Sequence, residues 1–291
     1  MFAKQTLRAG LVLPGGRYLA EEPLAQGGNG EVWVGLDVKT GRRVALKTLR
    51  PVRAVDERAV EAFKAEATAA LAVHHPAVVR TYQYVPDDDG PGVIVQQLVR
   101  GVSLASEVRR QGPMAPARAL RLLAQIARGL RAIHLAGYVH RDVSTVNIVL
   151  EPQDRPVLID FGIATPIGSQ VVTLDMLIPG NPDYLAPELA RGKPATEVAD
   201  IYSLGIVLLE CLMGTKPFTG MTPELIATAH VLRPAPAAPS TLPADLRAFI
   251  ALMVDKDPTR RPANALAVAR LMETWAHQLG VLRSAGAAAG G

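Results

Sequence analysis

The residues best suited to chemistry in this sequence lie in the stretch HRDVSTVN, residues 140–147. Asp142 can accept a proton from an attacking hydroxyl group, and Asn147, five positions later, can supply an oxygen ligand to a metal ion. An aspartate and an asparagine at this spacing fit a loop that catalyses phosphoryl transfer. A short motif also occurs by chance, so the loop needs support from the rest of the chain.

A second carboxylate, Asp160, ends the apolar stretch VLIDFG, residues 157–162. A carboxylate at the end of a buried strand is costly unless it meets a cation. A Mg²⁺ ion that bridges phosphate oxygens would supply that cation. The alternative is an aspartate that caps a turn.

A phosphate-binding group is predicted upstream of both carboxylates. Lys47 lies in the strand-like stretch VALK, after the glycine-rich stretch LAQGGNGEVWVG, whose backbone amides could face phosphate oxygens. Glu66, on a predicted helix, could orient the lysine ammonium. Each residue has a simpler alternative: a hairpin turn for the glycines, a surface lysine for Lys47 and an exposed helix residue for Glu66.

Two kinds of element position these residues. Alternating β-rich segments predict strands from residue 17 to about residue 98, with Gly41 in a hairpin turn and one helix over residues 56–73. After Gly101 the pattern changes to helices, over residues 116–137, 198–214, 246–254 and 264–279. The proline-rich stretch 233–243 is predicted to be a surface loop. Residues 1–16 are predicted to be an N-terminal leader, and residues 276–291 a tail that is disordered at its end.

Composition narrows the class of protein. The 291 residues are 49% hydrophobic and 20% charged, and 31 Lys and Arg against 27 Asp and Glu give a net charge of +4. The basic residues are scattered, so we expect no nucleic-acid partner. No apolar run approaches the length of a signal peptide or a membrane span. The one cysteine, Cys211, lies in an apolar run and is predicted to be an inert core thiol. We therefore expect a soluble, cytoplasmic protein.

The order of the motifs carries more information than any one of them. The glycine-rich hairpin, the strand lysine, the helix glutamate, HRD with its asparagine, DFG and finally APE at residues 186–188 occur in the order of the protein-kinase signature. The chain resembles a eukaryotic-type (Hanks-type) Ser/Thr protein kinase, and its Ala- and Arg-rich composition suggests a bacterial member. The resemblance covers residues 17–275. It implies an α+β, two-lobed fold, with a β-rich N-lobe over 17–98 and a mostly helical C-lobe over 102–275.

The resemblance also assigns roles to matching positions. Asp142 would be the catalytic base, Lys47 and Glu66 an ion pair, and Asn147 and Asp160 the Mg²⁺ ligands, with Mn²⁺ as an alternative metal. The nucleotide-covering loop would comprise Leu24, Ala25, Gln26, Gly27, Gly28, Asn29, Gly30, Glu31 and Val32. Adenine would lie between Val32 and Ala45 on one side and Val149 on the other, beside the gatekeeper Gln96 and the hinge residues Gln97, Leu98 and Val99. Glu188 would pair with Arg261, and Asp200 would anchor the backbone of the catalytic loop.

Three positions depart from the family pattern. Ala25 replaces the first loop glycine, which is tolerable if its φ is negative. Asn181 replaces the threonine that usually bonds to the catalytic aspartate, and its side chain could preserve that contact. Ser144 replaces a lysine near the transferred phosphate. Because serine carries no charge, we expect slowed but real chemistry, which kcat for Ser144→Lys would test.

The resemblance implies an ATP-dependent enzyme that phosphorylates Ser or Thr of proteins, including itself. A pseudokinase scaffold that binds nucleotide without turnover is the main alternative, and the intact Asp142 and Asp160 argue against it. A small-molecule kinase of related fold is a second alternative, and it would lack the APE segment and the Arg261 partner. Arg141 would meet a phosphate on the activation loop. Thr173 and Ser169 are the candidate sites, and Thr165 is a weaker one.

Overall fold

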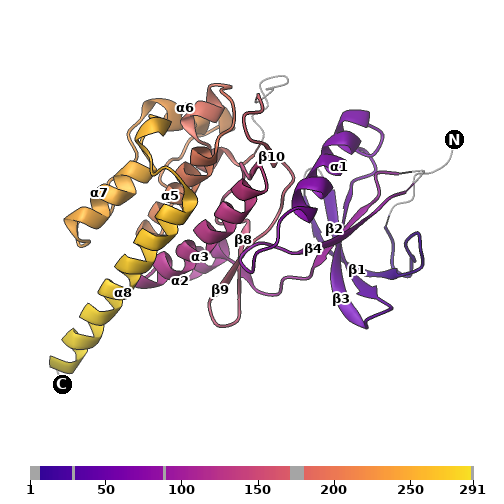
Figure 1. The fold of residues 1–291 in the computed structure, drawn as a ribbon, viewed down its shortest axis with the longest axis horizontal. Helices are drawn as coiled ribbons and strands as arrows, with labels where there is room; N and C mark the ends of the chain where they lie inside the picture. Colours follow the sequence, from indigo (N-terminus) through magenta and orange to yellow (C-terminus); the bar gives the residue numbers. More distant parts are fainter. Residues whose placement is uncertain (1–6, 28–29, 88–89, 171–179, 290–291) are drawn as a thin grey trace. The chain divides into compact units, whose positions relative to one another are not determined.

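The computed structural model describes residues 7–27, 30–87, 90–170 and 180–289. The chain divides into two compact units, Met1–Arg100 and Gly101–Gly291. The first is built around a sheet and the second mainly from helices (Figure 1). This confirms the predicted α+β class with a β-rich and a helical part.

The first unit contains one five-stranded antiparallel sheet of order β1-β2-β3-β5-β4. Its strands are β1 (Tyr18–Gln26), β2 (Gly30–Asp37), β3 (Arg42–Leu49), β4 (Thr81–Val85) and β5 (Val93–Gln97). The predicted β2–β3 hairpin is present, and Gly41 in its turn has φ +69°, a value that favours glycine.

Helix α1 (Glu57–Leu71) lies against this sheet (Figure 1). Asp56 caps its N-terminus by accepting a hydrogen bond from the Arg58 amide, close to the predicted start. Phe63 and Ala67 of the helix belong to one hydrophobic cluster with Leu49 and Ile94 of the sheet. Burial of this apolar stripe holds α1, and with it Glu66, against the sheet.

A second hydrophobic cluster of this unit includes residues that we expected to lie outside it. Leu7 and Leu13 are buried with Tyr18, Leu46 and Val95 of the sheet. Val12 also forms a β-bridge to Leu19. The described part of the predicted leader therefore packs on the sheet, because its leucines have an apolar surface to cover.

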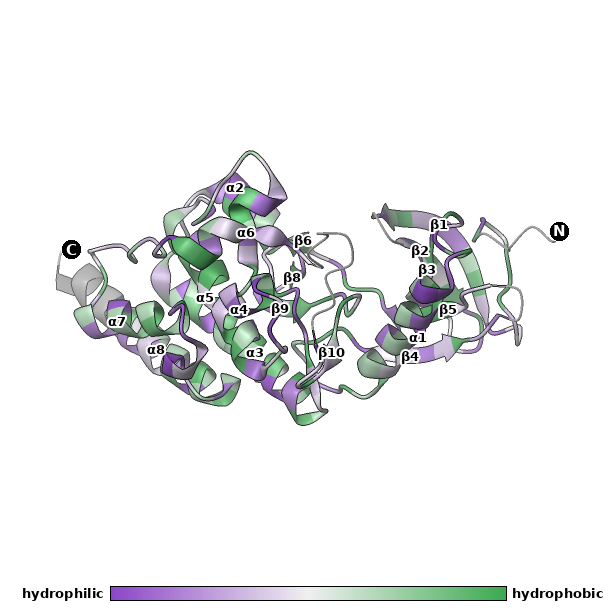
Figure 2. Ribbon diagram, turned by 90° about the horizontal axis from the view of Figure 1, so that it is seen from above, coloured by the Kyte–Doolittle hydropathy of each residue, from purple (hydrophilic) through white to green (hydrophobic). Residues whose placement is uncertain are grey.

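The second unit contains the helices α2 (Leu104–Gln111), α3 (Pro116–Leu135), α4 (Pro187–Ala190), α5 (Glu197–Met213), α6 (Pro223–Leu232), α7 (Ala244–Met253) and α8 (Ala265–Ala289), with short 3-10 helices η1 (Pro182–Tyr184) and η2 (Pro258–Arg260). Its short strands are β6 (Val102–Ser103), β7 (Tyr138–Val139), β8 (Ile148–Glu151), β9 (Arg155–Leu158) and β10 (Thr165–Pro166). Helix α5 is apolar along most of its length (Figure 2), and every residue from Ala199 to Leu212 is buried. The prediction of a buried helix here is confirmed.

Some elements differ from expectation. The short helices α2 and α6 were not predicted, since helices of 8 and 10 residues do not present a long apolar period. Helix α8 continues to Ala289, so the tail is helical well beyond residue 275. Its alanine-rich sequence, which suggested disorder, is also a strong helix former.

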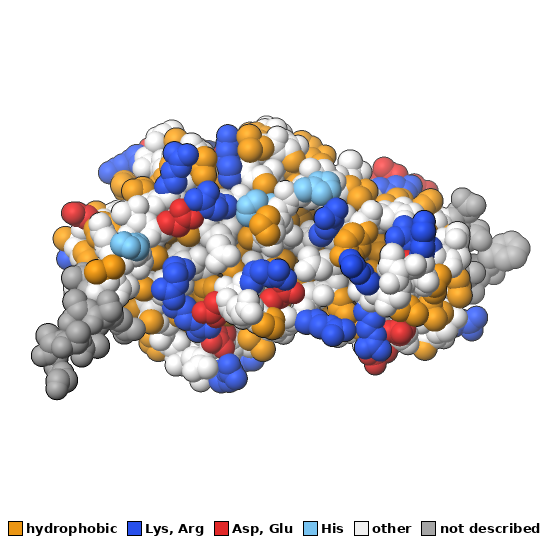
Figure 3. Space-filling model, turned by 60° about the horizontal axis from the view of Figure 1, so that its bottom comes forward, with side chains coloured by type: hydrophobic (Ala, Val, Ile, Leu, Met, Phe, Trp, Pro, Cys, Tyr) orange, Lys and Arg blue, Asp and Glu red, His pale blue; other side chains and the backbone are white. Residues whose placement is uncertain are grey.

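The surface agrees with the scattered charges of the sequence. On the face shown in Figure 3, Lys and Arg side chains lie among carboxylates and apolar side chains without gathering in one patch. In the part of the chain that the structure describes, no helix has both the length and the apolarity that a membrane span needs.

Candidate active site

The predicted site residues fall into two groups, one in each unit. In the first unit, β3 carries Lys47 and α1 carries Glu66. The Lys47 Nζ atom lies 2.5 Å from Glu66 Oε1, and the two side chains are 15% and 5% exposed. A largely buried ion pair excludes the alternatives of a surface lysine and an exposed helix glutamate. It also fixes the direction of the ammonium group.

The glycine-rich stretch includes the end of β1 and the start of β2. The Gly27 amide donates to the Gly30 carbonyl at 2.9 Å, while Gly28 and Asn29 lie outside the described residues. A Cβ on Gly30 would lie 2.8 Å from the Thr48 carbonyl oxygen, so the close approach of two strands requires glycine there. Ala25 is not among the described non-glycine residues with positive φ, which meets the condition for a methyl group at that position.

The nucleotide-contact candidates of this unit lie on four neighbouring strands, β1, β2, β3 and β5, and directly after β5. Across β3 and β5, Ala45 is paired with Gln96, and both are buried. Gln96 Nε2 donates to Thr81 Oγ1 at 3.0 Å. The Gln97 amide donates to the Arg80 carbonyl at 2.8 Å, and Leu98 and Val99 follow the end of β5. The remaining candidates here lie in the strands β1 and β2: Leu24, Gln26, Glu31 and Val32.

In the second unit, Asp200 of α5 holds the predicted catalytic loop, residues 140–147. Its carboxylate accepts hydrogen bonds from the backbone amides of His140 (2.9 Å) and Arg141 (2.8 Å) and contacts His134 Nε2 at 2.8 Å. Burial alone would raise the pKa of Asp200, but the bond from His134 and the amides lowers it overall. Asp200 is therefore a charged anchor for a loop in which Arg141 has φ +68°.

The carboxylate of Asp142 is oriented from both sides. Asn147 Nδ2 donates to Asp142 Oδ2 at 2.7 Å and to the Asp142 carbonyl at 3.0 Å. The Asn181 backbone amide donates to Asp142 Oδ1 at 3.1 Å. Burial raises the pKa of Asp142. These contacts leave a fixed carboxylate with more basic character than an exposed aspartate.

One sequence expectation about this carboxylate is corrected. Among the described residues, the Asn181 side chain makes no hydrogen bond to Asp142; its Oδ1 accepts from the Asp183 amide at 3.1 Å and caps η1. The contact to Asp142 is made by the Asn181 backbone instead. An asparagine prefers this local cap because its short side chain reaches the amide two residues ahead.

The β8–β9 hairpin brings the two candidate metal ligands to one end of an antiparallel pair. Ile148 is paired with Leu158, so Asn147 precedes β8 where Asp160 follows β9, and the Ile159 amide donates to the Asn147 carbonyl at 2.8 Å. Val149, the adenine-contact candidate of this unit, is on β8. Asp160 has φ +69°, and its Oδ1 accepts from the Gly162 amide at 2.9 Å, so it also caps a turn.

The donor set fits a hard divalent cation. The Nδ2 group of Asn147 is directed at Asp142, which turns its amide oxygen away from that carboxylate. An amide oxygen and a carboxylate are the ligand types that Mg²⁺ and Mn²⁺ prefer, and Mg²⁺ completes its shell with water and phosphate oxygens.

Ser144 is fully buried, and its Oγ makes no hydrogen bond among the described residues. From the sequence we expected Ser144 to lie near the transferred phosphate, as an uncharged replacement for a lysine. The structure instead places this hydroxyl inside the protein, which costs free energy because its bonds to water are lost.

Thr145, the residue after Ser144, belongs to a polar cluster that we did not predict from the sequence. Thr145 Oγ1 lies 2.7 Å from the Tyr184 hydroxyl, which donates to Glu210 Oε2 at 2.6 Å. All three residues are buried, and burial raises the pKa of Glu210. The available signal was Glu210 itself, a carboxylate within the apolar sequence of α5. Such a residue requires polar partners.

The predicted Glu188–Arg261 pair and the described candidate phosphorylation sites lie in the second unit. Arg261 binds Glu188 through two hydrogen bonds of 2.6 and 2.8 Å, and both residues are buried. Ser169 is half-buried, Thr165 lies in β10, and Thr173 lies outside the described residues. Arg141 Nε is buried and makes no hydrogen bond within the described ranges, and burial lowers the pKa of Arg141.

Cys211 is buried in α5, where burial raises the pKa of its thiol, in agreement with an inert core position.

Comparison with known proteins places this geometry in a family context. The family described as "Protein kinase domain" matches residues 18–276. The chain is 36% identical to serine/threonine-protein kinase PknA of Mycobacterium tuberculosis over 258 residues, which are 87% of this chain and 60% of that protein. It is 37% identical to PknA of Corynebacterium glutamicum over 253 residues, 86% of this chain and 54% of that protein. It is 38% identical to PknB of M. tuberculosis over 254 residues, 84% of this chain and 40% of that protein. The match thus spans between two fifths and three fifths of these relatives.

Proposed function

Because this chain belongs to the protein kinase domain family, we propose that it transfers the γ-phosphate of ATP to serine or threonine residues of proteins, its own included. The observation that carries the proposal is the half-buried Asp142 carboxylate, which is held by the Asn147 side chain and the Asn181 amide. We assign the kinase domain to residues 17–275, and the family match over residues 18–276 supports this.

Asp142 is the proposed base. A substrate hydroxyl would give its proton to Asp142 as its oxygen forms a bond to the γ-phosphorus, and the bond from that phosphorus to the β–γ bridging oxygen would break to release ADP. The raised pKa of Asp142 favours proton acceptance in the transition state. The two fixed hydrogen bonds keep the carboxylate oriented without reorganisation during the reaction.

Asn147 and Asp160 are the proposed ligands of Mg²⁺, with Mn²⁺ as an alternative. Bound there, the metal ion would neutralise charge on the phosphate oxygens. Lys47, directed by Glu66, would contact other phosphate oxygens as a fixed positive charge. The amides of the turn at Gly27 and Gly30 and the residues around Ala45, Gln96 and Val149 would bind the rest of the nucleotide.

We further propose that phosphorylation of Ser169 or Thr173 activates the enzyme. Arg141 supports this proposal, because its Nε group is buried beside the catalytic aspartate without a hydrogen-bond partner in the described part of the chain. A phosphate carries about −1.5 to −2 charge and would suit such a guanidinium. Mass spectrometry of active protein should find one of these residues modified, and active protein without either modification would contradict the proposal.

An autophosphorylation assay tests the main proposal. The chain, incubated with γ-labelled ATP and Mg²⁺, should incorporate label, and Asp142→Asn should reduce the rate at least a hundredfold. Nucleotide binding, measured by calorimetry, should persist in Asp142→Asn, since Asn keeps the shape of the loop. ATP binding without label transfer by the unmodified chain, to itself or to protein substrates, would support the pseudokinase alternative.

A further inference from the structure

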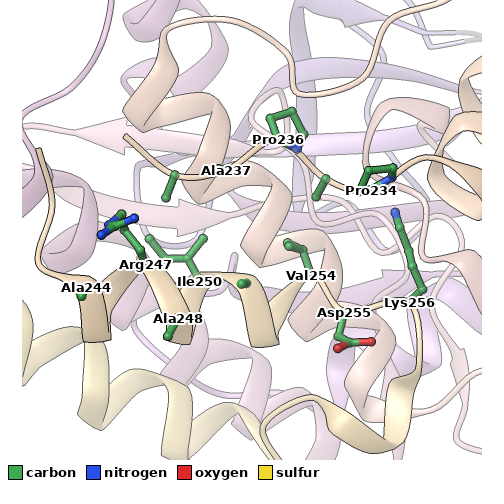
Figure 4. Close-up of a pocket in the computed structure, with 13 residues that line it drawn as sticks. Pro234, Pro236, Ala237, Ala244, Arg247, Ala248, Ile250, Val254, Asp255 and Lys256 are labelled. Carbon is green, nitrogen blue, oxygen red and sulfur yellow. The ribbon is translucent and has the colours of Figure 1, made fainter. Parts of the chain in front are cut away.

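A cavity of about 640 Å³ lies in the helical unit, between the proline-rich loop 234–238 and helix α7. In Figure 4, Pro234, Pro236 and Ala237 lie on one side, and Ile250 and Val254 on the other. The volume falls within the range of small-molecule sites, about 300–1,000 Å³. None of the residues proposed above for ATP, metal or catalysis lines it.

The lining is aliphatic, with charge at its edges. It consists of Pro234, Ala235, Pro236, Ala237, Ala238, Ala244, Arg247, Ala248, Ile250, Ala251, Val254, Asp255 and Lys256. The Asp255 carboxylate pairs with Arg260 at 3.4 Å and accepts from the Asp257 amide at 2.9 Å, and Figure 4 shows it turned away from the loop. Two cations therefore remain at the cavity, Arg247 and Lys256. The lining offers no aromatic ring for stacking.

Lys256 is an unusual cation. Its Nζ atom donates to the Tyr202 hydroxyl at 3.1 Å and lies 4.8 Å from the centre of the Phe218 ring, and it forms no ion pair within the described ranges. Burial, together with the positive charges of Arg261 and Arg191, lowers the pKa of Lys256 to about 8. A half-buried ammonium in positive surroundings would be stabilised by an anion.

A continuous series of hydrogen bonds leads from Lys256 to the catalytic loop. The Tyr202 hydroxyl lies 2.9 Å from His230 Nδ1, and His230 Nε2 lies 3.0 Å from the Asp183 carbonyl. A carbonyl only accepts, so His230 Nε2 carries the hydrogen. Burial lowers the pKa of His230 to about 4, so the ring is neutral and Nδ1 accepts from Tyr202.

The series continues through the backbone of η1. The Asp183 amide donates to Asn181 Oδ1, and the Asn181 amide donates to Asp142 Oδ1. The hydrogen bonds between Lys256 and Asp183 all run in one direction, because the Lys256 ammonium only donates and the Asp183 carbonyl only accepts. A change in the hydrogen bonding of Lys256 can thus alter the position of η1 and, through it, of Asp142.

We propose that this cavity binds a free aliphatic carboxylate, with its chain between the loop and α7 and its carboxylate on Lys256, and that binding changes the rate of phosphoryl transfer. An aliphatic body matches the Ala, Pro, Ile and Val lining, and a carboxylate matches the positive charge of Lys256, one of the two cations at the cavity. The effect on rate rests on the proposed kinase function, whereas binding does not.

Calorimetric titration of the full chain with octanoate tests binding, with 1-octanol as the uncharged probe. Octanoate should bind saturably, and Lys256→Met should weaken binding at least tenfold, since a hydrogen bond to a charged group is lost. Ala237→Phe, which fills the cavity and leaves Lys256 in place, should weaken it as much. Absence of saturable binding, or equal binding of 1-octanol, would overturn the proposal.

The proposed effect of octanoate binding on the rate of phosphoryl transfer needs a second measurement. Octanoate should change kcat on a peptide substrate at least twofold in the unmodified chain. It should leave kcat unchanged in Tyr202→Phe, which interrupts the series at one hydroxyl group but still binds octanoate. Binding with unchanged kcat in the unmodified chain would overturn the coupling. Because calorimetry requires no turnover, a chain that binds octanoate but phosphorylates nothing would contradict the kinase proposal and leave the binding site standing.

Discussion

Asn181 holds Asp142 through its backbone amide, 3.1 Å from Oδ1, while its side chain caps Asp183. The substitution that looked like a departure from the family pattern therefore does not determine the contact to Asp142. Any residue whose amide keeps this position would provide the same hydrogen bond. The side chain matters to η1 and the amide matters to the catalytic loop, and these two roles can be separated by mutation.

Asn181→Pro should lower kcat at least tenfold, whereas Asn181→Ala should change it less than about threefold. The φ of −83° at Asn181 accommodates a proline, which removes the amide hydrogen. The alanine variant loses only the cap, at a cost of about 1 kcal/mol in the free energy of unfolding. Steady-state kinetics and urea unfolding of both variants give the comparison. Equal losses of kcat would mean that the side chain acts on catalysis.

Glu66→Gln should lower kcat/KM for ATP at least tenfold, because the Lys47 ammonium would lose its charged partner. Glu61→Gln is the matched control on the same helix. Glu61 is 77% exposed and lies 3.7 Å from Lys64, a surface pair that contributes about 0–1 kcal/mol to stability. Kinetics as a function of ATP concentration separates the two variants. A similar loss in both would show that α1, rather than the Lys47 pair, is responsible.

Ser144→Ala should leave the free energy of unfolding unchanged or raise it by about 1 kcal/mol. The hydroxyl is buried without a partner in the described part of the chain, so its removal relieves a desolvation cost. Ser203→Ala is the opposite control, because Ser203 Oγ is buried with hydrogen bonds of 2.7 Å to the Tyr184 carbonyl and 3.2 Å to the Ala199 carbonyl. The free energy of unfolding of the Ser203→Ala variant should fall by about 1 kcal/mol or more. Urea unfolding of the two variants measures these changes. A lower free energy of unfolding for Ser144→Ala would mean that the Ser144 hydroxyl has a hydrogen-bond partner.

Ser144→Lys is expected to destabilise the fold before it can raise kcat. The serine side chain is fully buried, and an ammonium there would have to reach water past the surrounding core. Thermal unfolding should show a lower melting temperature, and kcat should not rise. A folded variant with a higher kcat would show that the lysine finds a path to the phosphate and would support the hypothesis drawn from the sequence.

The stability of the unmodified chain relative to Lys256→Met should increase as pH rises from 7 to 10. The pKa of Lys256 is lowered to about 8 in the folded protein, against about 10.4 in an unfolded chain. Between these values the unfolded state binds more protons, so the free energy of unfolding rises with pH. Urea unfolding of both proteins at several pH values measures the difference. A difference that falls with pH would mean that Lys256 is stabilised as a cation.

The sequence was sufficient for contacts between side chains that recur together in fixed order. The family resemblance implied the pairs Lys47–Glu66 and Glu188–Arg261, and both are present. The periodicity of residues 56–73 and the apolar character of residues 198–214 predicted the helices α1 and α5. The contact between Asp142 and the Asn181 amide did not follow, because every residue has an amide and its direction depends on φ and ψ.

Contacts between polar residues far apart in the sequence could not be predicted from the sequence either. Thr145 lies 65 residues before Glu210, and neither position has a neighbour in sequence that points to the other. The same holds for Lys256 and Tyr202, which are 54 residues apart. Glu210 was the one visible signal, since a carboxylate in an apolar helix requires partners, but its identity as the partner of Tyr184 required the fold.

Asp200 has a consequence for the order of events during synthesis. The amides of the catalytic loop are held by a carboxylate that lies 60 residues after His140, on a helix that must first pack into the core. A nascent chain emerges from the ribosome with HRDVSTVN long before Asp200. We therefore expect chains truncated before α5 to present the loop without its geometry and to lack the proposed kinase activity, so that this activity would arise only after most of the helical unit has been made.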